Sequence, residues 1–201
     1  MVDSPRPQFT AFIGPQRLAN GPLAEVAIAV MNAARRPAPP PIVIFADATG
    51  QPIDLDLRGT DREVIARLPQ PAADPEAVTE EISAGPRGRG RPKLGVVARE
   101  VTLLPRHWEW LGAQPGGASV ALRKLVEHAR RANGDADRTR AAHEAAYRFM
   151  SVMAGNLAGF EEASRALFAD DRRKFAGLIA AWPDDIRDHV VKLAFSDRAE
   201  V

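Results

Sequence analysis

Four cations lie close together near the middle of this 201-residue chain, at Arg87, Arg89, Arg91 and Lys93. Only glycine and proline separate them, and no acidic residue interrupts the run. Closely spaced guanidinium and ammonium groups suit the phosphates of a nucleic acid, since each neutralised phosphate releases bound counterions. The spacing therefore predicts contact with a polyanion.

The net charge of the whole chain is +1, which argues against a nucleic-acid partner. The charge is unevenly distributed, however. Residues 1–84 carry −4, residues 85–134 carry +7 and residues 135–201 carry −2. A basic central segment thus lies between two acidic ends, and residues 85–134 are where a negatively charged partner is expected to bind.

The core of the cationic run, Arg89-Gly90-Arg91-Pro92, resembles the AT-hook. That resemblance implies an extended peptide lying in the minor groove of A·T-rich double-stranded DNA. Gly90 would let the backbone approach the groove floor, and both arginines would point along a narrow, electronegative groove. Pro92 would keep the chain extended. The other interpretation is an Arg/Gly/Pro linker that is basic for solubility or binds RNA.

The next segment, 96–133, is predicted as strand, helix, glycine turn and second helix. This order resembles the ribbon-helix-helix family, which implies a homodimer whose paired strands enter the major groove. The strand departs from that pattern, because Glu100 and Thr102 would face the DNA while Arg99 would face inward. The alternative is a helical hairpin packed on the C-terminal helices. The residues that carry the resemblance are Val101, Thr102 and Leu103, then Pro105 to Leu111, then Ser119, Leu122, Arg123 and Leu125.

The leading functional hypothesis is therefore DNA binding, with a homodimer expected from the predicted strand. The predicted nucleic-acid-binding residues are Arg87, Arg89, Gly90, Arg91, Pro92, Lys93, Arg99, Arg106, Arg123 and Lys124. The alternative is a protein-interaction or regulatory module without a nucleic-acid role, using the apolar faces near Trp108, Trp110, Phe160 and Trp182. Trp108 and Trp110 are two positions apart and cannot share one helix face, and core packing is the expected role of both.

No catalytic or metal-binding residue is predicted, and no cofactor. The helical run from His143 to Tyr147 resembles a zinc-protease helix only superficially, because its second histidine is missing. The carboxylates Asp47, Asp54 and Asp56 could bind a cation, but such residues on a hairpin usually form its solvated face. An enzyme is the third hypothesis, since no acid, base and nucleophile group together in the sequence.

The predicted fold class is α+β. Residues 1–68 read as a small β-α-β-β-α unit: a strand at 9–13, a helix at 23–34, a hairpin of 42–45 with 53–57, and a short helix after the capping-box pair Thr60 and Glu63. Residues 69–95 read as a flexible charged linker with five prolines. Residues 96–133 hold the strand-helix-helix segment, and 134–201 are helical.

Composition excludes several classes of protein. There is no cysteine, so disulfides, thiolate catalysis and iron–sulfur clusters are excluded. No window holds the ~18 consecutive apolar residues of a membrane helix. The N-terminus lacks the pattern of a secretory signal. We therefore expect a cytoplasmic protein with no membrane partner.

Long stretches of the chain resemble an uncharacterised, proteobacterial-type family of domains of unknown function. They are FTAFIGPQRLANGPLAEVA, GRPKLGVVAREVTLLPRHWEWLGAQPGGASVALRKLV, AYRFMSVMAGNLAGFEEASRALF and AAWPDDIRDHVVKLA. The resemblance implies family membership and supplies no activity, cofactor or site.

Overall fold

The computed structural model describes residues 7–69, 97 and 99–196, which form two units. The first unit combines 1–68 with 135–201, and the second spans 69–134. The predicted α+β class is confirmed: the N-terminal part holds a sheet and the C-terminal half is helical. The sequence predicted 1–68 and 134–201 as separate parts, whereas the structure joins them in one unit.

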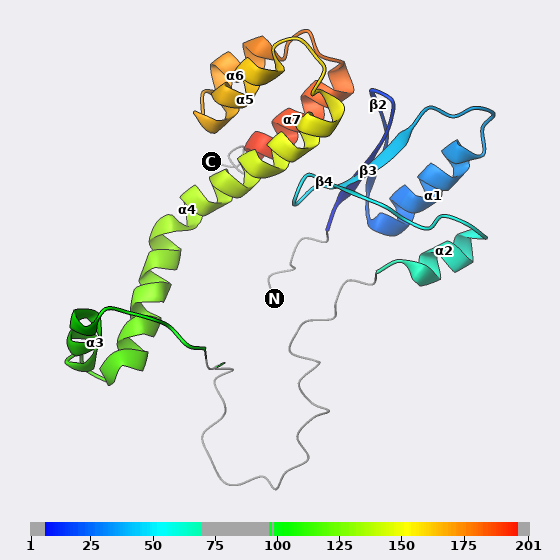
Figure 1. The fold of residues 1–201 in the computed structure, drawn as a ribbon. Coiled ribbons are helices and arrows are strands. Elements are labelled where there is room, and N and C mark those ends of the chain that lie inside the picture. Colours follow the sequence, from blue (N-terminus) through cyan, green and yellow to red (C-terminus); the bar gives the residue numbers. More distant parts are fainter. Residues whose placement is uncertain (1–6, 70–96, 98, 197–201) are drawn as a thin grey trace, which may run out of the picture. The chain divides into compact units, whose positions relative to one another are not determined.

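The sheet of the first unit has four antiparallel strands in the order β2-β1-β3-β4 (Figure 1). The strands are β1 (Phe9–Ile13), β2 (Gln16–Gly21), β3 (Ile42–Ala46) and β4 (Gln51–Ile53). β2 was not predicted, because its sequence QRLANG does not alternate apolar and polar residues. It forms because a two-residue turn at Gly14-Pro15 folds the chain back onto β1.

The β3–β4 hairpin is confirmed, but its second strand covers 51–53 and not the predicted 53–57. Beyond β4, Leu55 and Leu57 pack partly buried beneath two helices, α1 (Leu23–Ala34) and α2 (Asp61–Arg67). The predicted capping box of α2 is confirmed: the Thr60 hydroxyl accepts from the Glu63 backbone N–H, and the Thr60 backbone N–H donates to the Glu63 carboxylate.

The two faces of the sheet have different covers. α1 contributes Val26 and Val30, which pack with Ala11 and Ile44 on one side. On the other side Phe12 and Phe45 belong to the large core of the C-terminal helices. These helices are α4 (Gly117–Met153), α5 (Phe160–Phe168), α6 (Arg172–Leu178) and α7 (Asp184–Phe195). Within the first unit, α7 lies alongside the C-terminal half of α4 (Figure 1).

The helix α4 is continuous over 37 residues and crosses the boundary that the sequence predicted between 96–133 and 134–201. The polar run that begins at this boundary contains no proline. Ion pairs one turn apart support the helix there instead, joining Arg138 to Asp135 and Arg140 to Asp137.

The second unit contains α3 (Pro105–Gly112) and the first turns of α4, which we call the hairpin (α3 with residues 117–134). The helix start at Pro105 is confirmed. Residues 97 and 99–104 form no strand within the chain, where the sequence predicted one. A strand needs a partner for its backbone hydrogen bonds, and the described chain offers none there. The ribbon-helix-helix resemblance therefore finds no support.

No helix among the described residues is both long and apolar enough to cross a membrane.

The β3–β4 turn touches α4 through a glycine. Gly50 has a φ of +65°, and a Cβ placed on it would lie 1.8 Å from the backbone oxygen of Ala145. The Arg148 guanidinium donates to the Thr49 carbonyl at 3.1 Å beside this contact. The turn can therefore approach the helix so closely only because residue 50 has no side chain.

We predict that Gly50→Ala lowers the free energy of unfolding by roughly 3 kcal/mol, from overpacking together with a left-handed backbone. Urea denaturation of the purified chain measures this. Gly14→Ala is the matched control, because Gly14 also has a positive φ (+54°) but open space around it. It should lose only about 1–2 kcal/mol. Equal losses in the two variants would contradict the proposed contact.

Candidate functional site

The residues predicted to bind nucleic acid fall into two groups. Arg87, Arg89, Gly90, Arg91, Pro92 and Lys93 lie outside the described residues. The other four cations, Arg99, Arg106, Arg123 and Lys124, are all exposed on the second unit. None of these four forms an ion pair with another described residue. By contrast, Arg130 and Arg131 both pair with Glu127.

The tryptophans of α3 are exposed, so the prediction of core packing for both is wrong. Trp108 is 43% exposed and Trp110 is 54% exposed. A spacing of two residues places the two tryptophan side chains on different sides of α3, and the short hairpin cannot cover both. Only Leu111 of α3 is buried. Trp182, grouped with them as a candidate contact, is instead core, and its indole N–H donates to the Ala158 carbonyl.

Two apolar grooves cross the hairpin. One has a volume of about 270 Å³ and the other about 220 Å³. Trp110 and Leu125 line both grooves, so they form the ridge between them. Leu125 is 48% exposed, and its neighbour Val126 is 65% exposed. This apolar stretch of α4 is therefore only partly covered by other described residues.

A polar cluster surrounds Asp47, whose own side chain is only 10% exposed. Its carboxylate accepts from the Thr10 hydroxyl at 2.7 Å, from the Asn20 amide at 3.3 Å and from the Lys192 ammonium at 3.0 Å. The cluster joins β1, β2, the β3–β4 turn and α7. Sequence reasoning missed it, because Asp47 and Lys192 are 145 positions apart and no local pattern links them.

The solvated-face interpretation of the hairpin carboxylates therefore fails for Asp47, which is nearly buried. It holds for Asp56, which pairs with the exposed Arg58 at 2.9 Å. Hydrogen bonds from the side chain and backbone of Arg58 lower the pKa of Asp56 to about 2. Among the described residues no three histidine or acidic side chains are grouped to hold a metal ion.

His189 of α7 lies fully buried beside Asp47. Its ring centroid is 4.6 Å from that of Phe149 and 5.4 Å from that of Phe12. Its Nε2 is 3.8 Å from a carboxylate oxygen of Asp47, and neither ring nitrogen forms a hydrogen bond to a described residue. Burial lowers the pKa of His189 from 6.5 to about 4, against the opposing attraction of Asp47. The ring is thus a neutral core residue at neutral pH.

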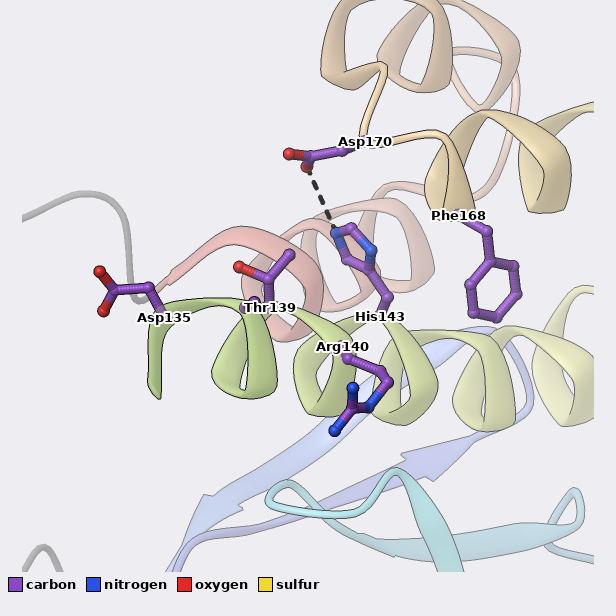
Figure 2. A pocket seen from close by; sticks show the side chains of 7 residues that line it. Asp135, Thr139, Arg140, His143, Phe168 and Asp170 are labelled. Carbon is purple, nitrogen blue, oxygen red and sulfur yellow. Dashed lines mark ion pairs between the residues drawn. The ribbon is translucent and has the colours of Figure 1, made fainter. Parts of the chain in front are cut away.

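A cavity of about 420 Å³ opens beside His143 in the first unit (Figure 2). His143 is 5% exposed, points toward Asp170, and brings its Nε2 within 3.5 Å of that carboxylate. The other polar side chains of the lining come from α4: Asp135, Thr139 and Arg140. Since Asp135 pairs with Arg138 and Arg140 with Asp137, their charges are already balanced within the helix. The cavity therefore contains a histidine–aspartate pair, to which we assign no reaction.

The model of an uncharacterised protein family conserved in bacteria, DUF2239, matches residues 8–194. The chain belongs to DUF2239. The family description assigns no activity, so the function of this DUF2239 protein has to be argued from its own residues. No curated protein and no solved structure matched the chain.

The buried His189 makes a prediction about acid stability. The pKa of His189 is lower in the folded state than in the unfolded state. Its contribution to the free energy of unfolding is therefore complete above pH 6.5 and is lost as the pH falls toward 4. We expect unfolding free energy to fall by about 3 kcal/mol over that range from this residue alone. Urea titrations at a series of pH values measure it.

His189→Gln should flatten this part of the pH profile, because the side chain of glutamine does not titrate. His128→Gln is the matched control: His128 is exposed on α4 and should leave the profile unchanged. A profile that keeps its slope in His189→Gln would assign the acid sensitivity to other groups.

Proposed function

We propose that this DUF2239 protein is a non-enzymatic binding module that docks a protein partner on the hairpin. The observation that carries the proposal is the exposed ridge of Trp110 and Leu125 between two apolar grooves. Exposed apolar patches of this kind mark interaction surfaces in soluble proteins. Tryptophan is also enriched among the residues that dominate binding energy at interfaces.

The composition of the hairpin supports the same proposal. Among its described residues, Leu111 and Ala121 are the only buried apolar side chains. Large apolar residues are exposed instead, which leaves much of the hydrophobic surface of the hairpin in contact with water. Covering that surface with a partner would yield about 25 cal/mol for each Å² of apolar area removed from water.

The size of the grooves favours protein side chains over a small ligand. Both volumes, about 270 and 220 Å³, lie below the ~300–1,000 Å³ of typical small-molecule pockets. Each groove can accept an apolar side chain from another protein.

Photocrosslinking tests the proposal. With p-benzoylphenylalanine in place of Trp110, in a bacterium that encodes the protein, we expect one dominant covalent adduct with a protein. Leu125→Asp in the same chain should abolish the adduct, because it removes the apolar ridge and a partner that covered the groove would have to desolvate the new carboxylate. Mass spectrometry identifies the product.

The control places the same photoreactive residue at Val191, which is 37% exposed on α7 in the first unit. It should give no comparable adduct. Adducts of equal yield at both positions, or an adduct that survives Leu125→Asp, would reject the hairpin as the docking face.

Nucleic-acid binding is the second candidate function, and the unpaired cations are the observation that favours it. Arg99, Arg106, Arg123 and Lys124 are exposed and form no ion pair with a described residue. They lie 6 to 31 positions after Lys93, the last of the four cations that begin at Arg87. A homodimer would bring two such sets to one A·T-rich duplex.

Salt-dependent binding to an A·T-rich duplex tests this second function. The four cations from Arg87 to Lys93 contribute a log–log slope of at most about −3.6, from ~0.9 for each neutralised phosphate. Arg89→Ala with Arg91→Ala should make the slope shallower by about 1.8. Arg58→Ala, which removes an exposed cation of the first unit, is the control. An unchanged slope, or no binding at low salt, ends the hypothesis.

A further inference from the structure

The ridge of the hairpin is flanked by positive charge. Lys124 lines the groove of about 220 Å³ together with Trp110 and Leu125. Arg106 lies four positions before Trp110 on α3, so both project from the same side of that helix. Neither cation pairs with a described acidic residue. Glu127 of α4 is already engaged by Arg130 and Arg131, and the exposed Glu109 of α3 is the one other described carboxylate of the hairpin, so cations remain in excess there.

The shape of this surface suits a helix. Two neighbouring grooves with a shared wall match two successive apolar side chains, which an amphipathic helix presents at i and i+3 or i+4. The lining of the groove of about 270 Å³ is apolar apart from His107, so it selects apolar anchors. The cations at the rim then favour a partner that carries acidic residues beside those apolar anchors.

We infer that the partner presents an acidic amphipathic helix to the hairpin. This inference rests on the proposed function and names the chemistry of the partner. Two apolar side chains of the helix occupy the grooves on either side of Trp110, and carboxylates beside them face Arg106 and Lys124. Electrostatic complementarity of this kind raises the association rate and rejects partners of the wrong charge.

The same observations argue against other occupants. A second copy of the chain would bring the same excess of cations to the contact, and like charges brought together are unfavourable. A nucleic acid would satisfy the cations but would leave the apolar grooves unfilled. The combination of apolar grooves with a basic rim therefore points to an acidic protein helix.

Three synthetic peptides test the inference on the full-length protein. The first carries leucines at i, i+4 and i+7 with glutamates on its remaining faces. The second has the same leucines with lysines in place of the glutamates. The third has the composition of the first in a scrambled order without an amphipathic face. Fluorescence anisotropy measures the binding of each at low and at physiological salt.

We expect the acidic amphipathic peptide to bind about tenfold or more tightly than the other two, and to weaken as salt rises. Trp110→Ala and Leu125→Ala should each cost about tenfold in affinity. Arg106→Glu with Lys124→Glu should reverse the preference toward the lysine peptide. Arg58→Glu, a charge reversal on an exposed residue of the first unit, should change nothing.

Equal binding of the acidic and lysine peptides, or no binding of either, would overturn the inference. So would a stable dimer that Leu125→Asp dissociates in light scattering, or displacement of the acidic peptide by duplex DNA. The proposed function fails separately, through the photocrosslinking at residue 110. If residue 110 forms an adduct but the three peptides bind equally, the hairpin remains the docking face and only the inference of an acidic partner is rejected.

Discussion

The structure of the first unit depends on the packing between one face of the sheet and the C-terminal helices. Phe149 of α4 contacts both Phe12 and Phe45, with ring centroids 5.2 and 4.9 Å apart. Among the described elements α1 covers the other face of the sheet, so without α4 and α7 these phenylalanines would be open to water. This requirement explains why the two ends of the chain form one unit. It also explains the glycine at position 50, where the hairpin turn meets the backbone of α4.

The same packing decides what the polar residues of the first unit do. Once the sheet docks on α7, Asp47 loses nearly all contact with water, and a buried carboxylate needs partners. Thr10, Asn20 and Lys192 supply them from three other elements. His189 beside them is kept neutral by its aromatic neighbours. The polar groups of this cluster therefore join elements to one another, and that role accounts for them without invoking catalysis.

Local patterns predicted most of the helices, and they failed where the outcome depends on distant residues. Pro105 and the capping box at Thr60 each mark the start of a helix that the structure contains. β2 was missed because pairing with β1, and not its own alternation, makes it a strand. The Asp47 cluster could not be predicted, since its members lie far apart in sequence. The exposure of Trp108 and Trp110 was also missed, because sequence pattern identifies an apolar face without saying what covers it.

The helix α4 is an example of an element whose apolar face is predicted from sequence while the cover of that face is not. Along its C-terminal part, Ala146, Phe149 and Met150 are buried in the core of the first unit. Along its N-terminal part an equally apolar pair, Leu125 and Val126, is exposed. Hydrophobic periodicity treats both stretches alike, and only the fold separates a stripe that the chain covers from one that it leaves open. The charges add what periodicity lacks. The cations beside the open stripe, Arg123 and Lys124, form no ion pair with a described residue, so this stretch of α4 combines exposed apolar side chains with available positive charge.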